Sequence, residues 1–322
     1  MSRTDEFEFI AQFLAPLAAG YEGAFGLADD AARMSALDGL IVTTDTLVQG
    51  VHFRHSDDWQ SVAGKAVRVN LSDLAGMAAR PHAVMLSITW PEAVTRDQQE
   101  IFALGFGETL KQFQIPLIGG DSTRGGDRLV VTVTAFGETQ KPLLRSKAKP
   151  GDHLFVTGTI GDAGLGLTAF DLGLEAGPAD VLNRRYLQPE PRLTMAEAAG
   201  RFASAGMDIS DGLIADAGHI AAVSGVGIEI YLSQLPLSGA AMSWLERQSE
   251  RDEALVQLAT AGDDYELLLS VPVENTAGLQ GAADAAGIAL TRIGRAVEGA
   301  GVRVLDTKGE PVQIIRSGFT HF

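Results

Sequence analysis

Aspartates recur beside glycine or hydroxyl residues at points where one expected secondary-structure element gives way to the next. The segments that carry them are Asp29-Asp30, Thr43-Thr44-Asp45, Ser72-Asp73, Gly119-Gly120-Asp121, Asp208-Ile209-Ser210-Asp211-Gly212 and Gly262-Asp263-Asp264. A single aspartate at such a junction is more often a turn residue or a helix cap than a ligand. Six junctions of this kind in one chain indicate converging carboxylates, which repel one another and need a cation. Because Mg²⁺ prefers oxygen ligands and is usually shared with substrate phosphates, the pattern predicts phosphate chemistry.

Motifs for other phosphate-binding and hydrolytic sites are weak or missing in the sequence. It contains no G-x-x-x-x-G-K-[ST] loop, and no serine lies in a G-x-S-x-G elbow. Residues 164–169 match the loose G-x-G-x-x-[GA] dinucleotide pattern. However, the preceding expected strand ends near Thr157, and no acidic residue follows at a second strand end. Glycines that allow close helix packing are therefore the better interpretation of this segment.

Two further residues each have two interpretations. His52 follows Asp45 by seven positions, and it is either part of the candidate site or a packed histidine at a strand end. Arg145 lies near an expected domain boundary, and it is either a solvated cation or a bidentate clamp for phosphate. The residues alone leave both alternatives open.

The composition excludes several classes of function. The 322-residue chain has 25 Lys and Arg against 41 Asp and Glu, a formal net charge of −16, and no cysteine. This charge argues against nucleic acid or an anionic membrane as a partner. Without cysteine there is no disulfide, thiolate metal site or cysteine nucleophile. The acidic N-terminus does not resemble a signal peptide, and no apolar run reaches the length of a membrane span, so we expect a cytoplasmic protein.

Helices and strands of both halves of the chain are expected to position these residues. Apolar spacing predicts helices at 5–19, 62–79, 98–113 and 276–286. Short β-rich runs predict strands at 40–44, 83–89, 116–118, 129–136, 153–157, 227–232 and 265–271, and a hairpin over 302–315 that turns at 306–309. Turn formers and charges cluster at 147–152. We therefore expect an α+β protein with two α/β-type domains, 1–148 and 149–322, whose mixed sheets are flanked by helices.

Seven motifs in order resemble the thiamine-monophosphate kinase family, which shares a superfamily with aminoimidazole ribonucleotide synthetase and selenophosphate synthetase. The motifs are Asp29-Asp30-Ala31-Ala32, the segment 43–53 with the pattern T-T-D-x-L-x-x-G-V-H-F, Asn70-Leu71-Ser72-Asp73-Leu74-Ala75, Gly119-Gly120-Asp121-Ser122-Thr123, residues 156–162, residues 207–213 and Gly262-Asp263-Asp264-Tyr265-Glu266-Leu267. The resemblance extends over essentially the whole chain. One such motif would be weak evidence, whereas seven in order are specific.

The resemblance implies ATP-dependent phosphorylation of thiamine monophosphate to thiamine diphosphate, with several Mg²⁺ ions. It also implies a homodimer that pairs through the N-terminal domain, which binds ATP, while the C-terminal domain contributes metal and substrate residues. By motif position, the implied metal ligands are Asp30, Thr43, Thr44, Asp45, Asp73, Asp121, Asp208 and Asp211. The implied ATP contacts are Gly120, Asp121, Arg145 and Ser210. The implied substrate contacts are His52, Asp263 and Phe319.

Three positions depart from the usual pattern of the family. Ala28 stands where the family usually has glycine, Asp263 where it often has glutamate, and Phe319 where it often has tryptophan. The carboxylate is kept, and an aromatic face that attracts a cationic thiazolium is kept as well.

The main alternative is another ATP-dependent enzyme of the same superfamily. The missing cysteine argues against selenophosphate synthetase and the hydrogenase-maturation relatives, and segment 43–53 argues against aminoimidazole ribonucleotide synthetase. A non-catalytic module that binds Mg²⁺ or a nucleotide is an alternative of a different class. An assay for turnover distinguishes all of these.

The implied acceptor needs no general base and no protein nucleophile. A phosphate with a second pKa near 6 is mostly dianionic at pH 7, so it can attack without losing a proton. Its obstacle is charge, since two unit charges at about 4 Å repel by roughly 4 kcal/mol at an effective dielectric near 20. We therefore expect direct in-line transfer that depends on positioning and on charge neutralisation by Mg²⁺.

Overall fold

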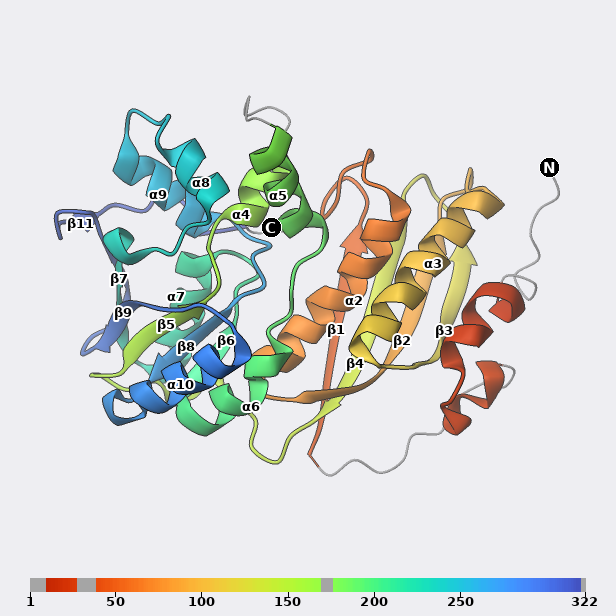
Figure 1. Cartoon of the computed structure of the whole chain (residues 1–322), viewed down its shortest axis with the longest axis horizontal. Helices are drawn as coiled ribbons and strands as arrows, with labels where there is room; N and C mark the ends of the chain where they lie inside the picture. The colour runs from red at the N-terminus through yellow and green to blue at the C-terminus, as the bar shows by residue number, and fades with distance from the viewer. Residues whose placement is uncertain (1–9, 28–38, 169–175, 320–322) are drawn as a thin grey trace. The chain divides into compact units, whose positions relative to one another are not determined.

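The computed structural model describes residues 10–27, 39–168 and 176–319, and the chain divides into two compact units (Figure 1). Unit 1 consists of Met1–Leu74 and Arg80–Gln140, and unit 2 of Ala75–Ala79 and Lys141–Phe322. Unit 2 therefore takes a short segment from within the sequence of unit 1. None of the described helices is both long enough and apolar enough to cross a membrane.

Unit 1 is built on a four-stranded sheet in the order β1-β4-β2-β3. The strands are β1 (Leu40–Val48), β2 (Arg80–Trp90), β3 (Leu117–Arg124) and β4 (Val130–Glu138). β4 is antiparallel to β1 and β2, and β2 is parallel to β3. β4 alternates valine with threonine over residues 131–134, and Val131 and Val133 are buried, as expected for a pleated strand with one face toward a core.

Two long helices cover one face of this sheet (Figure 1). They are α2 (Trp59–Gly76) and α3 (Arg96–Phe113). α3 begins after Thr95, which forms a capping box with Gln98 and so satisfies two amides that the helix leaves free. The centroid of the Trp90 ring lies 5.9 Å from that of Trp59 and 5.4 Å from that of Phe102, so an aromatic cluster joins the helices to β2.

The opposite face of this sheet is covered only in part. Three short helical turns precede β1, namely η1 (Ile10–Leu14), η2 (Ala15–Ala18) and η3 (Glu22–Leu27). Ala18 and Ala24 from these turns pack with Ala83 and Ile118 of the sheet. Toward β1 the face is open, and every second residue of that strand is exposed: Leu40, Val42, Thr44 and Thr46.

Unit 2 contains a seven-stranded mixed sheet in the order β11-β10-β7-β9-β5-β8-β6. Its strands are β5 (His153–Thr157), β6 (Ala205–Asp208), β7 (Gly227–Tyr231), β8 (Leu267–Val271), β9 (Leu290–Val297), β10 (Gly301–Leu305) and β11 (Pro311–Val312). Its α-helices are α4 (Asp162–Thr168), α5 (Ala176–Leu187), α6 (Leu193–Phe202), α7 (Leu213–Ser224), α8 (Gly239–Leu245), α9 (Arg251–Thr260) and α10 (Thr276–Ala286). Short turns are η4 (Arg145–Lys147), η6 (Leu232–Gln234) and η7 (Val273–Asn275).

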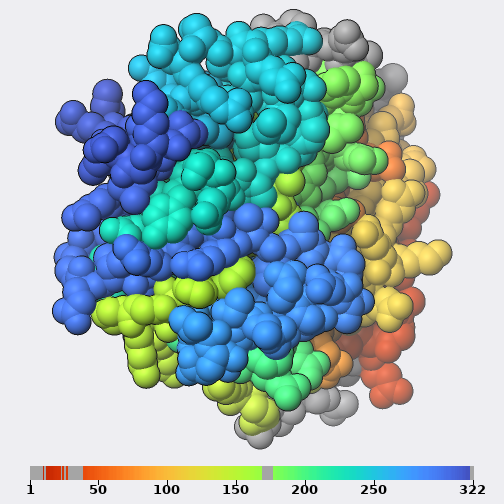
Figure 2. Space-filling model, turned by 60° about the vertical axis from the view of Figure 1, so that its left-hand side comes forward, coloured from red at the N-terminus to blue at the C-terminus, as the bar shows by residue number. Residues whose placement is uncertain are grey.

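The sheet of unit 2 lies between two layers of helices. Leu154 and Val156 of β5 belong to a core that includes α7, α8 and α9, whereas Phe155 belongs to the core under α6 and α10. This alternation is the pattern of a strand that is buried on both faces. Figure 2 shows one face of unit 2, where the C-terminal strands (dark blue) lie beside α8 and α9 (light blue).

The α+β class and the two mixed sheets flanked by helices are confirmed. The strand at 153–157 and the helix at 276–286 have the predicted bounds, and the hairpin turns between β10 and β11 as predicted. The expected helix at 5–19 is wrong over its described part. Residues from Ile10 form π and 3₁₀ turns, and Pro16, which lacks an amide donor, stands in the first turn of η2.

Several strands extend further than predicted, and two of these extensions carry candidate site residues. β1 continues to Val48, and β3 continues to Arg124, so Asp45 and Asp121 lie inside strands. Gly120 permits this in β3, because a Cβ at that position would lie 1.8 Å from the carbonyl oxygen of Leu86. β6 and β9 were not predicted from the sequence.

Candidate active site

In unit 1, β1 and α2 bring together three of the predicted metal ligands. Thr43 and Asp45 are two residues apart in β1 and therefore lie on the same face. Asn70 and Asp73 are one helical turn apart in α2 and face this strand. The Thr43 hydroxyl donates to Asp73 Oδ2 at 2.5 Å, and the backbone N–H of Asp45 donates to Asn70 Oδ1 at 3.1 Å.

Thr44 and Asp121 lie on the opposite, open face of the sheet. The Thr44 hydroxyl approaches the carbonyl oxygen of Val133 at 3.2 Å and the hydroxyl of Thr134 at 3.1 Å. One register row across the four strands consists of Thr46, Thr132, Ser87 and Asp121. Asp121 is exposed at the β3 end of this row. The sheet thus separates Thr44 and Asp121 from the cluster of Thr43, Asp45 and Asp73.

His52 is tied to the end of β1. Its Nδ1 accepts the backbone N–H of Val48 at 3.0 Å, which fixes the ring against the turn that follows the strand. The ring is half-buried. This arrangement is a packed histidine at a strand end, and contact of His52 with a ligand stays a prediction.

In unit 2, three loops meet at one edge of the sheet. β8 is antiparallel to both β5 and β6, so the carboxyl ends of β5 and β6 lie beside the start of β8. The segments that meet there are 157–162, 208–212 and 262–266. Asp208 is the last residue of β6 and is buried, while Asp211 is half-buried.

The loop at 209–212 is hydrogen-bonded to the segments that carry two predicted substrate residues. The backbone N–H of Asp263 donates to the carbonyl of Ser210 at 2.8 Å, and that of Phe319 donates to the carbonyl of Asp211 at 2.9 Å. Gly318 allows the close approach of the last segment, because a Cβ there would lie 2.4 Å from the same carbonyl oxygen. Ser210, Asp211, Asp263 and Phe319 are therefore neighbours.

One predicted residue of unit 2, Arg145, lies away from the cluster at this edge of the sheet. Arg145 is exposed in η4, where its carbonyl accepts the hydroxyl of Ser224 at the end of α7. Asp211 precedes the start of that helix, and a twelve-residue helix is about 18 Å long at 1.5 Å per residue. Asp30, with its neighbours, lies outside the described residues.

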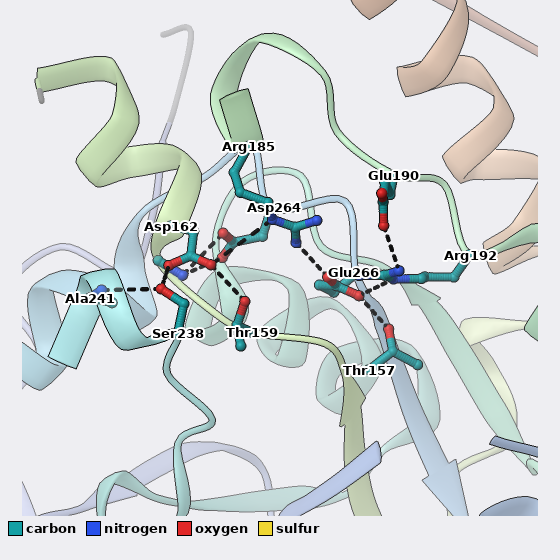
Figure 3. Close-up of polar contacts among 11 residues, drawn as sticks. Thr157, Thr159, Asp162, Arg185, Glu190, Arg192, Ser238, Ala241, Asp264 and Glu266 are labelled. Carbon is teal, nitrogen blue, oxygen red and sulfur yellow. Dashed lines mark hydrogen bonds and ion pairs between the residues drawn. The ribbon is translucent and has the colours of Figure 1, made fainter. Parts of the chain in front are cut away.

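Sequence reasoning assigned no role to a buried ionic cluster at the same edge of unit 2 (Figure 3). Glu266 is fully buried, and Arg185 and Arg192 approach it from two sides, each with a guanidinium nitrogen 2.5 Å from its carboxylate. The hydroxyl of Thr157 donates to the same carboxylate at 2.7 Å. Gly158, with φ of 58°, is required here because a Cβ would lie 2.1 Å from Glu266 Oε1.

A second group of acids lies beside this pair. Asp162 accepts the hydroxyls of Thr159 and Ser238, each at 2.6 Å, and Asp264 accepts the N–H of Gly161. Burial raises the pKa of Asp264 well above its usual range, and the nearby charges of Asp162 and Glu266 add to this, while the hydrogen bonds from Gly161 oppose it.

Asp216 is a further residue near the site to which the sequence analysis gave no role. It lies in the first turn of α7 and is 1% exposed, and its Oδ2 accepts the backbone N–H groups of Ser210, Asp211 and Gly212. Burial raises the pKa of Asp216 to about 7, and the charge of Asp211 adds to this, while the three N–H bonds oppose it. Its sequence signal is weak, since an acid in the first turn of a helix is ordinary.

Comparisons with known proteins agree with this architecture. The family models "AIR synthase related protein, N-terminal domain" and "AIR synthase related protein, C-terminal domain" match residues 28–139 and 149–307. A thiamine-monophosphate kinase of Caulobacter vibrioides is 42% identical over 320 residues, which covers 98% of this chain and 90% of the relative.

Two solved structures extend the likeness to the fold. The crystal structure of thiamine-monophosphate kinase from Stenotrophomonas maltophilia K279a superposes with a TM-score of 0.80 at 38% identity, covering 89% of this chain and 91% of that one. The structure "AaThiL complexed with AMPPCP and TMP" gives a TM-score of 0.78 at 31% identity, covering 100% of this chain and 99% of that one. These findings confirm the resemblance predicted from the seven motifs: the chain belongs to the thiamine-monophosphate kinase family.

Proposed function

We propose that the protein transfers the γ-phosphoryl group of ATP to thiamine monophosphate and forms thiamine diphosphate. The observation that carries the proposal is the likeness, along the full chain, to a structure whose ligands are AMPPCP, an analogue of ATP, and TMP, which we take as thiamine monophosphate. The same activity is named for relatives that cover nearly the whole chain. All the proposed site residues except Arg145 and Phe319 lie in the seven motifs of this sequence.

The oxygen donors of unit 1 fit Mg²⁺. Thr43, Asp45 and Asp73 offer hydroxyl and carboxylate oxygens from one side of β1 and from α2, which are the hard donors that Mg²⁺ prefers. We propose as metal-holding residues Asp30, Thr43, Thr44, Asp45, Asp73, Asp121, Asp208 and Asp211. When bound, Mg²⁺ would neutralise the negative charge of the phosphates.

The remaining side chains bind and orient the two substrates. We propose that Gly120, Asp121, Arg145 and Ser210 contact ATP. We propose that His52, Asp263 and Phe319 contact thiamine monophosphate, with the carboxylate and the aromatic face attracting the cationic thiazolium. On this assignment, residues 1–148 supply most of the ATP contacts and form the dimer, and residues 149–322 supply Ser210 and further metal and substrate contacts.

The reaction requires no proton transfer by the protein. An oxygen of the dianionic acceptor phosphate attacks the γ-phosphorus, a new P–O bond forms, and the bond to the β-phosphate oxygen breaks with release of ADP. The protein's part is to hold acceptor, donor and leaving group in line. No phosphorylated enzyme is formed on this route.

One assay tests the proposed function and its main alternatives. Incubation with Mg²⁺, ATP and thiamine monophosphate is expected to give thiamine diphosphate and ADP in equal amounts, measured by HPLC, with unphosphorylated thiamine as the control acceptor. ATP bound but unchanged would contradict the kinase and support a binding module. A ³²P-labelled protein after incubation with [γ-³²P]ATP alone would contradict direct transfer.

We also propose that the protein is a homodimer that pairs through the open face of the unit 1 sheet. The support is the edge strand β1, where Leu40 and Val42 are 48% and 53% exposed in a row with Thr44 and Thr46. A half-covered sheet with an exposed apolar edge is a typical surface for pairing with a second chain. The expected cytoplasmic location stays a prediction.

Val42→Asp is expected to convert the dimer into monomers, because it places a charge in the apolar part of the proposed interface. Light scattering after gel filtration should give twice the chain mass of 33.9 kDa for the wild type and the single mass for the variant. Val273→Asp is the matched control, since Val273 is 57% exposed in unit 2. A monomeric wild type, or a Val42→Asp variant that stays dimeric, would contradict this surface.

A further inference from the structure

We infer that Asp216 is a positioning residue, which holds the 209–212 loop so that Asp211 and the segments carrying Asp263 and Phe319 take their places in the site. Its Oδ2 accepts three successive backbone N–H groups, from Ser210 at 3.0 Å and from Asp211 and Gly212 at 3.2 Å each. The kinetic part of the inference rests on the proposed function. The structural part does not.

No side chain caps the helix at the end of this loop. Gly212 is the N-cap of α7 and makes no side-chain cap bond, whereas most helices use Ser, Thr, Asp or Asn there. A side chain at Gly212 is excluded, since its φ is 120° and a Cβ would lie 2.8 Å from the carbonyl oxygen of Thr260. Asp216 reaches back from the first turn to the N–H of Gly212, as the acid of a capping box does, and also to those of Ser210 and Asp211.

The carbonyl groups of the same loop hold two other segments. The carbonyl of Ser210 accepts the N–H of Asp263, that of Ile209 accepts the N–H of Tyr265, and that of Asp211 accepts the N–H of Phe319. The Tyr265 hydroxyl in turn donates to the Asp263 carboxylate at 3.2 Å. Asp216 therefore fixes the N–H groups of the 209–212 loop. The carbonyl groups of this loop in turn fix the backbone at Asp263 and Phe319, the two proposed substrate residues.

The two aspartates of the loop and helix have different tasks in this arrangement. A carboxylate oxygen of Asp216 lies within 4.8 Å of a carboxylate oxygen of Asp211. However, Asp216 is buried, and its Oδ2 accepts hydrogen bonds from backbone N–H groups. Asp211 is half-buried and belongs to the loop that Asp216 fixes. Because Asp216 binds backbone groups of the loop, it sets the position of Asp211, the proposed metal ligand, without touching the substrate.

Hydrogen exchange tests the positioning without any substrate. In Asp216→Ala, peptides covering 208–214 and 262–266 are expected to lose protection by about tenfold or more, because three amides lose a buried acceptor. Asp152→Asn is the matched control, since Asp152 Oδ2 also accepts three donors, from Lys149, Ser204 and Ser270 at the other end of β5. Unchanged protection of both peptides in Asp216→Ala would overturn the inference.

Kinetics and metal binding separate positioning from a ligand role or a merely structural one. Asp216→Asn keeps one acceptor oxygen, so we expect kcat to fall by about tenfold to a hundredfold, and further in Asp216→Ala. Asp152→Asn should lower the thermal midpoint and leave kcat and KM unchanged. If Asp216→Asn lost Mn²⁺ binding while loop protection stayed intact, Asp216 would be a ligand and the inference would be wrong. A wild type that forms no thiamine diphosphate would defeat the proposed function, whereas the exchange result would stand.

Discussion

Asp45→Asn is expected to lower kcat/KM for thiamine diphosphate formation by about 10³-fold or more, since several kcal/mol of charge stabilisation depend on the carboxylates proposed to hold Mg²⁺. The variant should fold, because the Asp45 contact with Asn70 is made by its backbone N–H and survives the substitution. Asparagine also keeps the shape of the side chain. Initial rates measured over a range of Mg²⁺ concentrations, with thermal unfolding alongside, check this expectation.

A matched control separates loss of the ligand from a general loss of charge. Asp97 is an exposed acid in the first turn of α3, in the same unit, and Asp97→Asn removes the same charge from the surface. We expect this control to keep its activity. Near-normal turnover in Asp45→Asn would remove Asp45 from the proposed metal site, even if the protein proved to be the expected kinase.

Arg192→Met is expected to lower the free energy of unfolding by about 3–5 kcal/mol, because it leaves a buried carboxylate with one partner fewer. Glu266 is fully buried, and Arg192 holds it through two nitrogens while Arg185 holds it through one. Burial lowers the pKa of the Arg192 guanidinium, but the hydrogen bonds and the charge of Glu266 outweigh this and raise that pKa above its usual value. Denaturant unfolding followed by circular dichroism measures the change.

Two further variants test whether the loss arises from the uncompensated charge. Arg303 approaches Glu229 at 3.5 Å, but its side chain is 65% exposed, so Arg303→Met should change stability by less than about 1 kcal/mol. Adding Glu266→Gln to Arg192→Met removes the buried charge and is expected to recover part of the loss. An Arg192→Met variant as stable as the wild type would show that the second arginine alone satisfies Glu266.

The element types were largely predictable from sequence, and the misses have physical causes. β6 has only four residues, Ala205–Asp208, one of them glycine, so neither its length nor its periodicity gives a signal. β9 is interrupted by Gly294, which lies against the backbone of Glu229, where a Cβ would be 1.9 Å from a carbonyl oxygen. In both strands the residue types suit contacts with segments that are distant in the sequence. Local β-propensity does not predict such contacts.

The candidate site was predictable as a set of residues but not as an arrangement. Thr43 and Asp73 were both predicted ligands, yet only the fold brings them within hydrogen-bond distance across 30 positions of sequence. Arg192 and Arg185, which bind Glu266, lie 74 and 81 positions away from it in the sequence. Neither arginine lies in a motif that the sequence analysis used. Residues that act by binding backbone or buried charge carry little local signal, whereas residues that meet ligands recur in recognisable motifs.

The segment Ala75–Ala79, which unit 2 takes from within the sequence of unit 1, affects how the protein can be made and divided. Ala75 packs in the unit 2 core with Leu143 and Phe155. During synthesis, residues 1–140 emerge first, but this segment cannot be buried until later strands leave the ribosome. A fragment that starts at Lys141 lacks part of its own core, so the halves of this chain are not independent building blocks.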